Sequence, residues 1–127
     1  MPKILVVEDD PIVQELCRAV LNREGFEAIV AGNGVEGLEF FLKSHAEIVL
    51  ILSDIIMPRM NGIEMIRSIF STHAHANVLV MSGTPLFGFP PHEVARLCGV
   101  LKKPFTNAQL VHAVNRCLNP GDELISE

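Results

Sequence analysis

The 127-residue sequence has no tryptophan and no tyrosine, and its only cysteines are Cys17, Cys98 and Cys117. These cysteines form no CxxC pair and have no zinc-type spacing, which excludes the common cysteine-based metal modules. An odd number of cysteines without a secretory signal predicts reduced thiols in a cytoplasmic protein. Cys17 and Cys117 fall on the inward faces of expected helices, so we expect both to pack in the core.

The chain is also poor in positive charge and in long apolar runs. It has 10 lysines and arginines against 15 acidic residues, a formal charge of −5, so it lacks the basic surface that nucleic-acid binding requires. No basic and apolar leader follows Met1, and no apolar run approaches the ~18 residues of a spanning helix. We therefore expect no membrane contact and no nucleic-acid contact through this domain. Internal repeats are absent as well.

The residues that are present suit a single globular domain with a large core, since 49% of them are hydrophobic. Five short apolar runs predict buried strands, at residues 3–7, 26–31, 48–53, 77–82 and 100–103. Segments with helical periodicity follow each run, with inward faces such as Val35, Leu38, Phe41 and Leu42 in the second. The fourth helix is expected to be short, about residues 92–97. This alternation predicts an α/β fold, a doubly wound five-stranded parallel sheet with helices on both faces.

Acidic, hydroxyl and lysine side chains follow four of the five predicted strands. Glu8 and Asp9 follow the first strand, Asp54 the third, Ser82 the fourth, and Lys103 closes the fifth. The carboxyl ends of parallel strands lie along one edge of a sheet, so these side chains should converge there. Converging carboxylates repel one another unless a cation neutralises them, and Mg²⁺ with oxygen ligands is suited to that task.

A carboxylate in such a place can act as a nucleophile that accepts a phosphoryl group. Phosphoryl transfer needs mainly positioning and charge neutralisation, which Mg²⁺ and the ammonium group of Lys103 would provide. Ser82 adds a hydroxyl that can donate to a phosphoryl oxygen. These residues together indicate that Asp54 is a phosphate acceptor.

Four motifs resemble, in order and spacing, those of response-regulator receiver domains of two-component signalling, in particular the single-domain chemotaxis type. They are "KILVVEDDP", "LSDIIMPRMNG", "VLVMSG" and "LKKPF". The resemblance implies a flavodoxin-like strand order of 2-1-3-4-5. It also implies a receiver domain over residues 1–120, with residues 121–127 as a polar tail or the start of a linker.

By position in the motifs, the resemblance implies that Asp54 is the phosphoacceptor. Glu8 and Asp9 match the acidic pair that holds Mg²⁺, together with Asp54 and the backbone carbonyl of Ile56. No other cofactor is implied, and the domain is expected to be a signalling phosphoacceptor rather than an enzyme.

Ser82 matches the switch hydroxyl of the family, and Lys103 matches its phosphate-binding lysine. The peptide bond from Lys103 to Pro104 is cis in the family. The implied partners are a sensor histidine kinase or a histidine phosphotransfer protein, and a downstream protein at the face formed by the fourth helix, the fifth strand and the fifth helix.

The sequence departs from the family pattern at three places. Glu8 replaces the more usual aspartate, so we expect Mg²⁺ to be held through water or more weakly, with activity retained. Val100 replaces an aromatic switch residue and is most simply a buried strand residue. The segment "GTPLFGFPPHEV" delays the fourth helix, and we expect Phe87 and Phe89 to be partly exposed there and to contact a partner.

Two other functions remain open at this point. A degenerate receiver would bind partners without phosphorylation. The presence of Asp9, Asp54 and Lys103 argues against it, whereas Glu8, Val100 and the unusual loop before the fourth helix leave it open. An aspartyl phosphatase would need an acid–base aspartate two residues after Asp54, where this chain has Ile56. His73 and His75 suggest a metal pair, but no third ligand follows at useful spacing, which favours a polar loop.

Overall fold

The computed structural model describes residues 1–57, 59–83 and 89–120. The strands are β1 (Lys3–Val7), β2 (Glu27–Ala31), β3 (Ile48–Asp54), β4 (Val78–Ser82) and β5 (Gly99–Lys102). The helices are α1 (Pro11–Arg23), α2 (Gly34–Ser44), α3 (Gly62–Thr72), α4 (Pro91–Val94) and α5 (Asn107–Leu118). Expectations about Pro58, about Phe87 and about the 121–127 tail fall outside the described residues.

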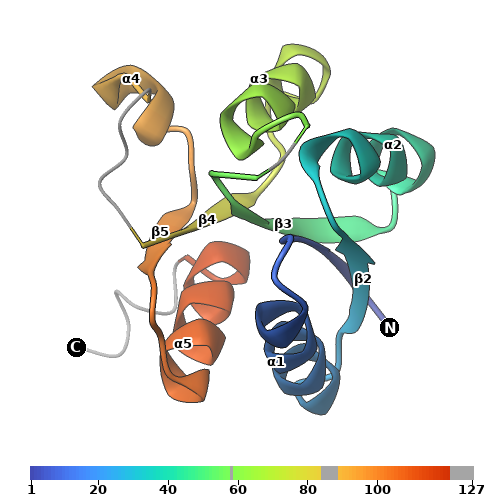
Figure 1. The fold of residues 1–127 in the computed structure, drawn as a ribbon, viewed down its shortest axis with the longest axis vertical. Helices are drawn as coiled ribbons and strands as arrows, with labels where there is room; N and C mark the ends of the chain where they lie inside the picture. Colours follow the sequence, from blue (N-terminus) through green and yellow to red (C-terminus); the bar gives the residue numbers. More distant parts are fainter. Residues whose placement is uncertain (58, 84–88, 121–127) are drawn as a thin grey trace.

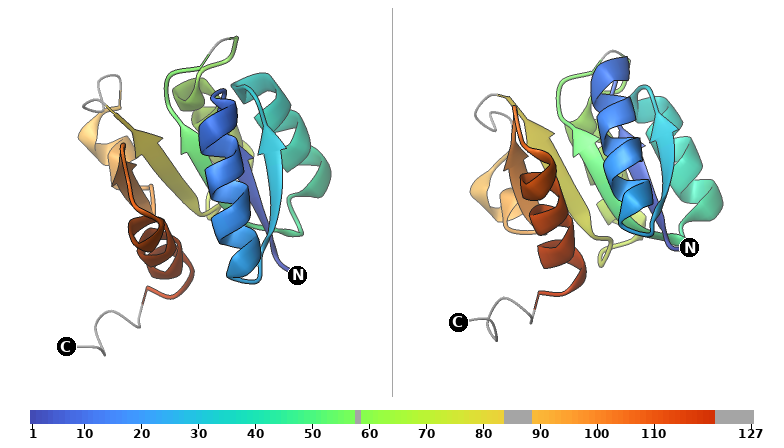
Figure 2. Two further views of the ribbon diagram at one scale, coloured as in Figure 1. Left: turned by 60° about the horizontal axis from the view of Figure 1, so that its bottom comes forward. Right: turned by 90° about the horizontal axis from the view of Figure 1, so that it is seen from below.

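The five strands form one parallel sheet in the order β2-β1-β3-β4-β5. Helices α2, α3 and α4 cover one face of this sheet, and α1 and α5 cover the other (Figures 1 and 2). The predicted fold class, strand order and short fourth helix are confirmed. Among the described helices, none is long and apolar enough to cross a membrane.

Two apolar clusters, one on each face of the sheet, make up the core. The strands supply both, because neighbouring side chains point to opposite faces. Leu5 and Val7 join the cluster under α2 and α3, while Ile4 and Val6 join the cluster under α1 and α5. Because β1 and β3 are buried on both faces, their sequences are apolar runs and do not alternate with polar residues.

Polar caps define where the helices begin. Asp10 is the N-terminal cap of α1, and its side chain accepts a hydrogen bond from the Ile12 amide. Pro11 is the first helical residue. Thr106 and Gln109 form the predicted capping box of α5. A second capping box, between Asn61 and Glu64, starts α3 directly after the loop that follows Asp54. The Lys103–Pro104 peptide bond is cis, as the resemblance implied.

Three expectations about burial were wrong. Val100 is 46% exposed, because it lies on the side of β5 where the four-residue α4 gives little cover. Phe89 is only 7% exposed, since it packs into the core cluster with Ile66 and Phe70. Leu42 is exposed because the inward stripe of α2 runs through Phe41, and the next residue already lies outside that stripe.

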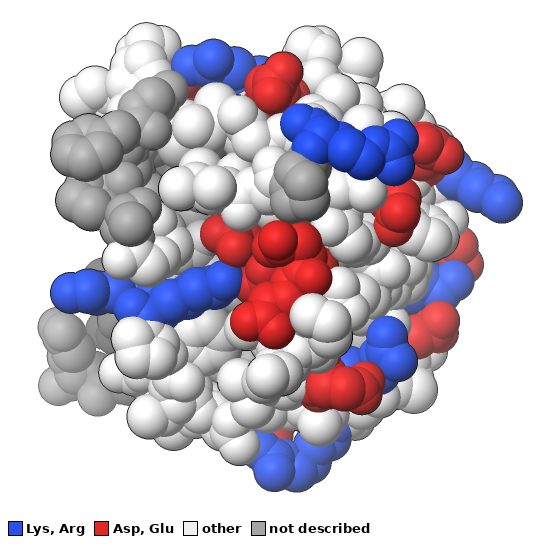
Figure 3. Space-filling view, viewed as in Figure 1, with Lys and Arg blue, Asp and Glu red and all other residues white. Residues whose placement is uncertain are grey.

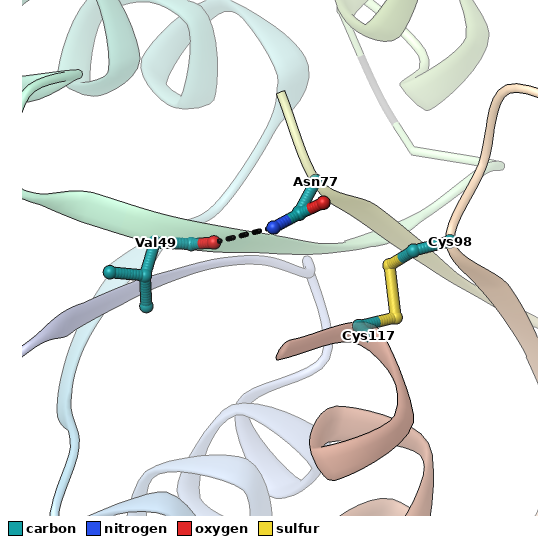
Figure 4. Close-up of a disulfide and its surroundings, with 4 residues drawn as sticks. All are labelled: Val49, Asn77, Cys98 and Cys117. Carbon is teal, nitrogen blue, oxygen red and sulfur yellow. Dashed lines mark hydrogen bonds between the residues drawn. A yellow bond between two sulfur atoms is a disulfide. The ribbon is translucent and has the colours of Figure 1, made fainter. Parts of the chain in front are cut away.

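The prediction of three reduced thiols was also wrong. Cys98 and Cys117 form a disulfide that joins the start of β5 to the last turn of α5 (Figure 4). Because α5 packs back along β5, the two Cα atoms lie 5.2 Å apart although 19 residues separate them in the sequence. Cys17 is a free thiol and is buried, as expected. Burial raises the pKa of Cys17 to about 12.

Candidate functional site

The strand ends bring acidic side chains together at one edge of the sheet. Figure 3 looks onto that edge and shows an acidic patch in the middle of the face, with a band of basic side chains beside it. Glu8, Asp9 and Asp54 each offer a carboxylate oxygen, and these oxygens lie within 4.8 Å of one another. The convergence expected from parallel strands is therefore present.

Asp54 is the last residue of β3, in the middle of the sheet, and its side chain is 14% exposed. Its Oδ1 accepts a hydrogen bond of 2.7 Å from the Ile55 amide, and its Oδ2 accepts one of 2.9 Å from Lys103 Nζ. The Ser53 hydroxyl donates to the Asp54 carbonyl at 2.7 Å. The carboxylate is thus held in one orientation while solvent can still reach it.

Glu8 lies deeper in the site and is fully buried. Its carboxylate accepts hydrogen bonds from the backbone amides of Asp9 and Asp10, at 2.9 and 3.3 Å, and from Lys103 Nζ. Burial raises the pKa of Glu8 from 4.5 to about 7; the hydrogen bond from Lys103 opposes this rise, and the charge of Asp54 adds to it. Glu8 thus contacts Lys103 from the buried side of the site.

Lys103 follows β5 directly, and its ammonium group contacts both Glu8 and Asp54. Burial alone would lower the pKa of Lys103, but the hydrogen bonds to the two carboxylates outweigh it and raise that pKa above 10.5. The side chain therefore carries a positive charge next to Asp54 at neutral pH.

The remaining predicted site residues lie around this group. Asp9 is exposed at the rim, and Ser82 is buried at the end of β4, beside β3. Ile56 is exposed, two residues after Asp54. The donor set fits a hard divalent cation, because three carboxylates with a single lysine leave net negative charge.

Two supporting residues were not predicted. Gln14 in α1 donates from its side chain to the Glu8 carbonyl at 2.6 Å, which fixes the backbone next to the acidic pair. The Gly62 amide donates to the Ile55 carbonyl at 2.7 Å, so the loop after β3 closes back onto the strand end. The turn-like pair of Asn61 and Gly62 was a signal for the second contact, whereas no sequence signal marked Gln14.

Comparison with known proteins identifies relatives. A family profile described as "Response regulator receiver domain" matches residues 4–115. The "Transcriptional regulatory protein CpxR homolog" of Haemophilus influenzae is 33% identical over 125 residues, which cover 93% of this chain and 51% of that protein. The chain therefore spans about half the length of this curated relative.

Solved structures agree with the sequence match. A response regulator receiver domain protein from Clostridium thermocellum superposes with a TM-score of 0.85 at 26% identity, covering 98% of this chain and 99% of the other. Response regulator protein TrrA from Thermotoga maritima, solved in complex with Mg²⁺-BeF, gives a TM-score of 0.82 at 28% identity. That match covers 93% of this chain and 100% of the other.

Proposed function

The chain belongs to the response regulator receiver domain family, and from that premise we propose that Asp54 accepts a phosphoryl group from a phosphohistidine of a sensor kinase or phosphotransfer protein. The observation that carries the proposal is the geometry of the Asp54 carboxylate. It is held by the Ile55 amide and by Lys103, and it lies next to two further carboxylates. This arrangement suits a nucleophile that gains negative charge during the reaction.

In the proposed reaction, a carboxylate oxygen of Asp54 attacks the phosphorus atom of the phosphohistidine. An O–P bond forms, the N–P bond breaks, and the donor histidine leaves with the bonding electron pair. Lys103 stays within hydrogen-bond distance of Asp54 and balances the charge that collects on the phosphoryl oxygens. Ser82, buried beside β3, would donate its hydroxyl to the phosphorylated side chain.

We assign Asp9, Asp54 and the Ile56 carbonyl to hold Mg²⁺, with Glu8 contributing less directly. Glu8 already accepts hydrogen bonds from two amides and from Lys103, so its carboxylate is less available than that of the exposed Asp9. When bound, Mg²⁺ would supply positive charge to the phosphoryl oxygens. The complex of the Thermotoga maritima relative with Mg²⁺-BeF supports this assignment.

Phosphorylation would bias two states of the domain through Ser82 and Lys103. We propose that a downstream protein reads this change at the face formed by α4, β5 and α5. Val100 cannot rotate as an aromatic ring would, and it is already exposed on β5. We therefore propose that Val100 contributes a fixed apolar contact to this face. We also propose that the receiver domain spans residues 1–120 and that the protein acts in the cytoplasm.

A receiver that binds partners without phosphorylation is the second candidate. Two observations favour it: Val100 stands in place of an aromatic residue, and Lys103 is already paired with both Glu8 and Asp54. In that case the ion pairs of Lys103 with Glu8 and Asp54 would be a permanent structural link at the sheet edge. Partner binding would then not depend on phosphorylation of Asp54.

Intact-mass measurement after incubation with acetyl phosphate and Mg²⁺ distinguishes the two functions. We expect a single phosphoryl adduct on the wild type and on the control Asp10→Asn, which alters only a helix cap. We expect no adduct on Asp54→Asn. Absence of an adduct on the folded wild type, together with no Mg²⁺ binding by calorimetry, would contradict phosphorylation and favour the second candidate.

A further inference from the structure

An open cavity of about 350 Å³ lies at the opposite edge of the sheet from Asp54. The ends of α2 and α3 and the beginnings of β3 and β4 surround it. Three of the chain's five histidines line it, namely His45, His73 and His75. The proposed phosphorylation chemistry uses none of them.

The rings of His45 and His73 are in contact although 28 residues separate them. Their centroids lie 4.5 Å apart, with the planes tilted by 52°. Phe41 packs its ring against His73 at 4.9 Å in an edge-on arrangement and lies 6.1 Å from His45. Since Phe41 is buried, it fixes the position of the His73 ring from the core side.

A side-chain contact holds the His73 ring. The Thr72 hydroxyl oxygen lies 2.8 Å from His73 Nδ1 and 3.4 Å from the Ile69 carbonyl. With Nε2 bound to a metal ion, Nδ1 keeps its proton and donates it to the Thr72 oxygen. Metal-binding histidines are commonly oriented in this way.

The spacing of the two rings suits a shared metal ion. With a metal–nitrogen bond of about 2.0–2.1 Å, the ion lies about 3.2 Å from the centre of an imidazole ring. Two rings at a right angle around one ion then have centres about 4.5 Å apart, whereas a tetrahedral angle gives about 5.2 Å. The observed distance of 4.5 Å is within the range in which two imidazole rings share one ion.

The surroundings also favour a cation. His45 and His73 are the C-terminal caps of α2 and α3, so the negative ends of two helix dipoles point toward this region. His45 is exposed and His73 half-buried, so an ion can reach both rings from solvent. Among the described residues, His45, His73 and His75 do not bring three nitrogens within 4.8 Å of one another, so the candidate ligands are the two rings in contact, His45 and His73.

We propose that His45 and His73 bind a divalent transition-metal ion, Cu²⁺ in preference to Zn²⁺, with water in the remaining positions. Imidazole nitrogens bind Cu²⁺ more tightly than the other divalent ions of the first transition row, and Mg²⁺, which prefers oxygen ligands, does not compete. Binding joins the ends of α2 and α3. It is independent of Asp54, so it stands whether or not the domain is phosphorylated.

Titration with Cu²⁺ in the presence of excess Mg²⁺, followed by calorimetry and by electron paramagnetic resonance, tests the site. We expect one tight site on the wild type, with hyperfine splitting from two nitrogens. His45→Phe keeps a ring beside His73 but removes the ligand nitrogen, and it should bind at least tenfold more weakly with only one nitrogen in the spectrum. Thr72→Val should weaken binding about tenfold by releasing the His73 ring.

The matched control is His92→Ala/His112→Ala, which removes two exposed histidines elsewhere, and Asp54→Asn is a second control. Both should bind Cu²⁺ as the wild type does. Wild-type affinity in folded His45→Phe would overturn the proposal. Loss of the tight site in Asp54→Asn or in the two-histidine control would also overturn it, since the ion would then lie elsewhere.

Discussion

At the scale of single residues, the position of Asp54 depends on backbone contacts as much as on its side-chain partners. Gly62 begins α3 directly against the end of β3, where its amide donates to the Ile55 carbonyl at 2.7 Å. A Cβ atom at Gly62 would overlap the Asp54 carbonyl oxygen and lie 2.9 Å from Ile55 Cα. Only glycine allows the two segments to approach so closely.

We therefore expect Gly62→Ala to lower the free energy of unfolding by about 2 kcal/mol, because backbone atoms must move apart. It should also slow phosphorylation, because Asp54 moves with its carbonyl. Urea unfolding and the intact-mass assay measure the two effects. Gly83→Ala is the control at the same edge, since its Cβ would meet nothing closer than Lys103 Cβ at 3.8 Å. Equal stability of both variants would contradict the argument.

At the scale of elements, the disulfide ties β5 to α5, two elements of the proposed output face. Closing a loop of this length restricts the unfolded chain, and the chain-entropy relation gives about 3 kcal/mol for it. We expect reduction by dithiothreitol to lower the free energy of unfolding by up to about 3 kcal/mol. The folded structure should be kept, because both cysteines lie among packed apolar side chains.

Urea unfolding with and without dithiothreitol measures this difference. The double variant Cys98→Ser/Cys117→Ser should match the reduced wild type and should not respond to the reductant. Cys17→Ser serves as the control that keeps the bond. If the wild type unfolded at the same urea concentration in both conditions, the disulfide would have no stabilising effect.

The short α4 is tied to α3 by charged side chains. Arg67 contacts Glu93 through two hydrogen bonds, of 2.8 and 2.7 Å, and Arg96 lies 4.3 Å from the centre of the Phe70 ring. The hydrogen bond from Arg67 lowers the pKa of Glu93 below 4.5. A carboxyl whose pKa is lowered on folding stabilises the fold above its unfolded pKa, and this stabilisation is lost as pH falls through the folded value.

We expect wild type to be more stable than Glu93→Gln at pH 7, and the difference to vanish as the pH falls below 4.5. Both groups are near the surface, so added salt should reduce the difference at pH 7. Urea unfolding over this pH range tests the expectation, with Glu39→Gln on α2 as the control. A difference that persists at low pH would show that packing, and not charge, holds α4.

At the scale of the whole molecule, the sequence was sufficient to predict the fold and the proximity of Asp54 to Lys103. Apolar runs alternating with helical periodicity fix a parallel sheet, and a parallel sheet places its strand ends along one edge. The wrong expectations concern how side chains pack around those elements. Val100 and Phe89 were misjudged because the extent of α4 decides which side chains are covered.

The contacts that the sequence did not reveal join residues far apart in the chain. Cys98 with Cys117, and His45 with His73, are brought together by the relative positions of two packed elements. The pair of His73 and His75 drew attention to the second of these regions, but the partner ring comes from α2. Such pairings have no local signal in a single sequence.

The two core clusters share one sheet, and this predicts that the domain unfolds as a unit. Ile69 belongs to the cluster under α3 and Leu110 to the cluster under α5, and both are fully buried. We expect Ile69→Ala and Leu110→Ala each to cost about 2–5 kcal/mol of unfolding free energy. Because the β1 and β3 strands pack on both clusters, each variant should destabilise both faces together.

Far-UV circular dichroism measures the free energy of unfolding, since the chain has no tryptophan for fluorescence. Methyl NMR measures the unfolding of each face of the sheet. Methyl signals from Val7 and Val6, on opposite faces of β1, should be lost at the same urea concentration in each variant. The costs of the two substitutions should add in the double variant, because the side chains lie on opposite faces of the sheet. Loss of one set of signals before the other would mean that a helix layer separates from the sheet while the second layer stays folded.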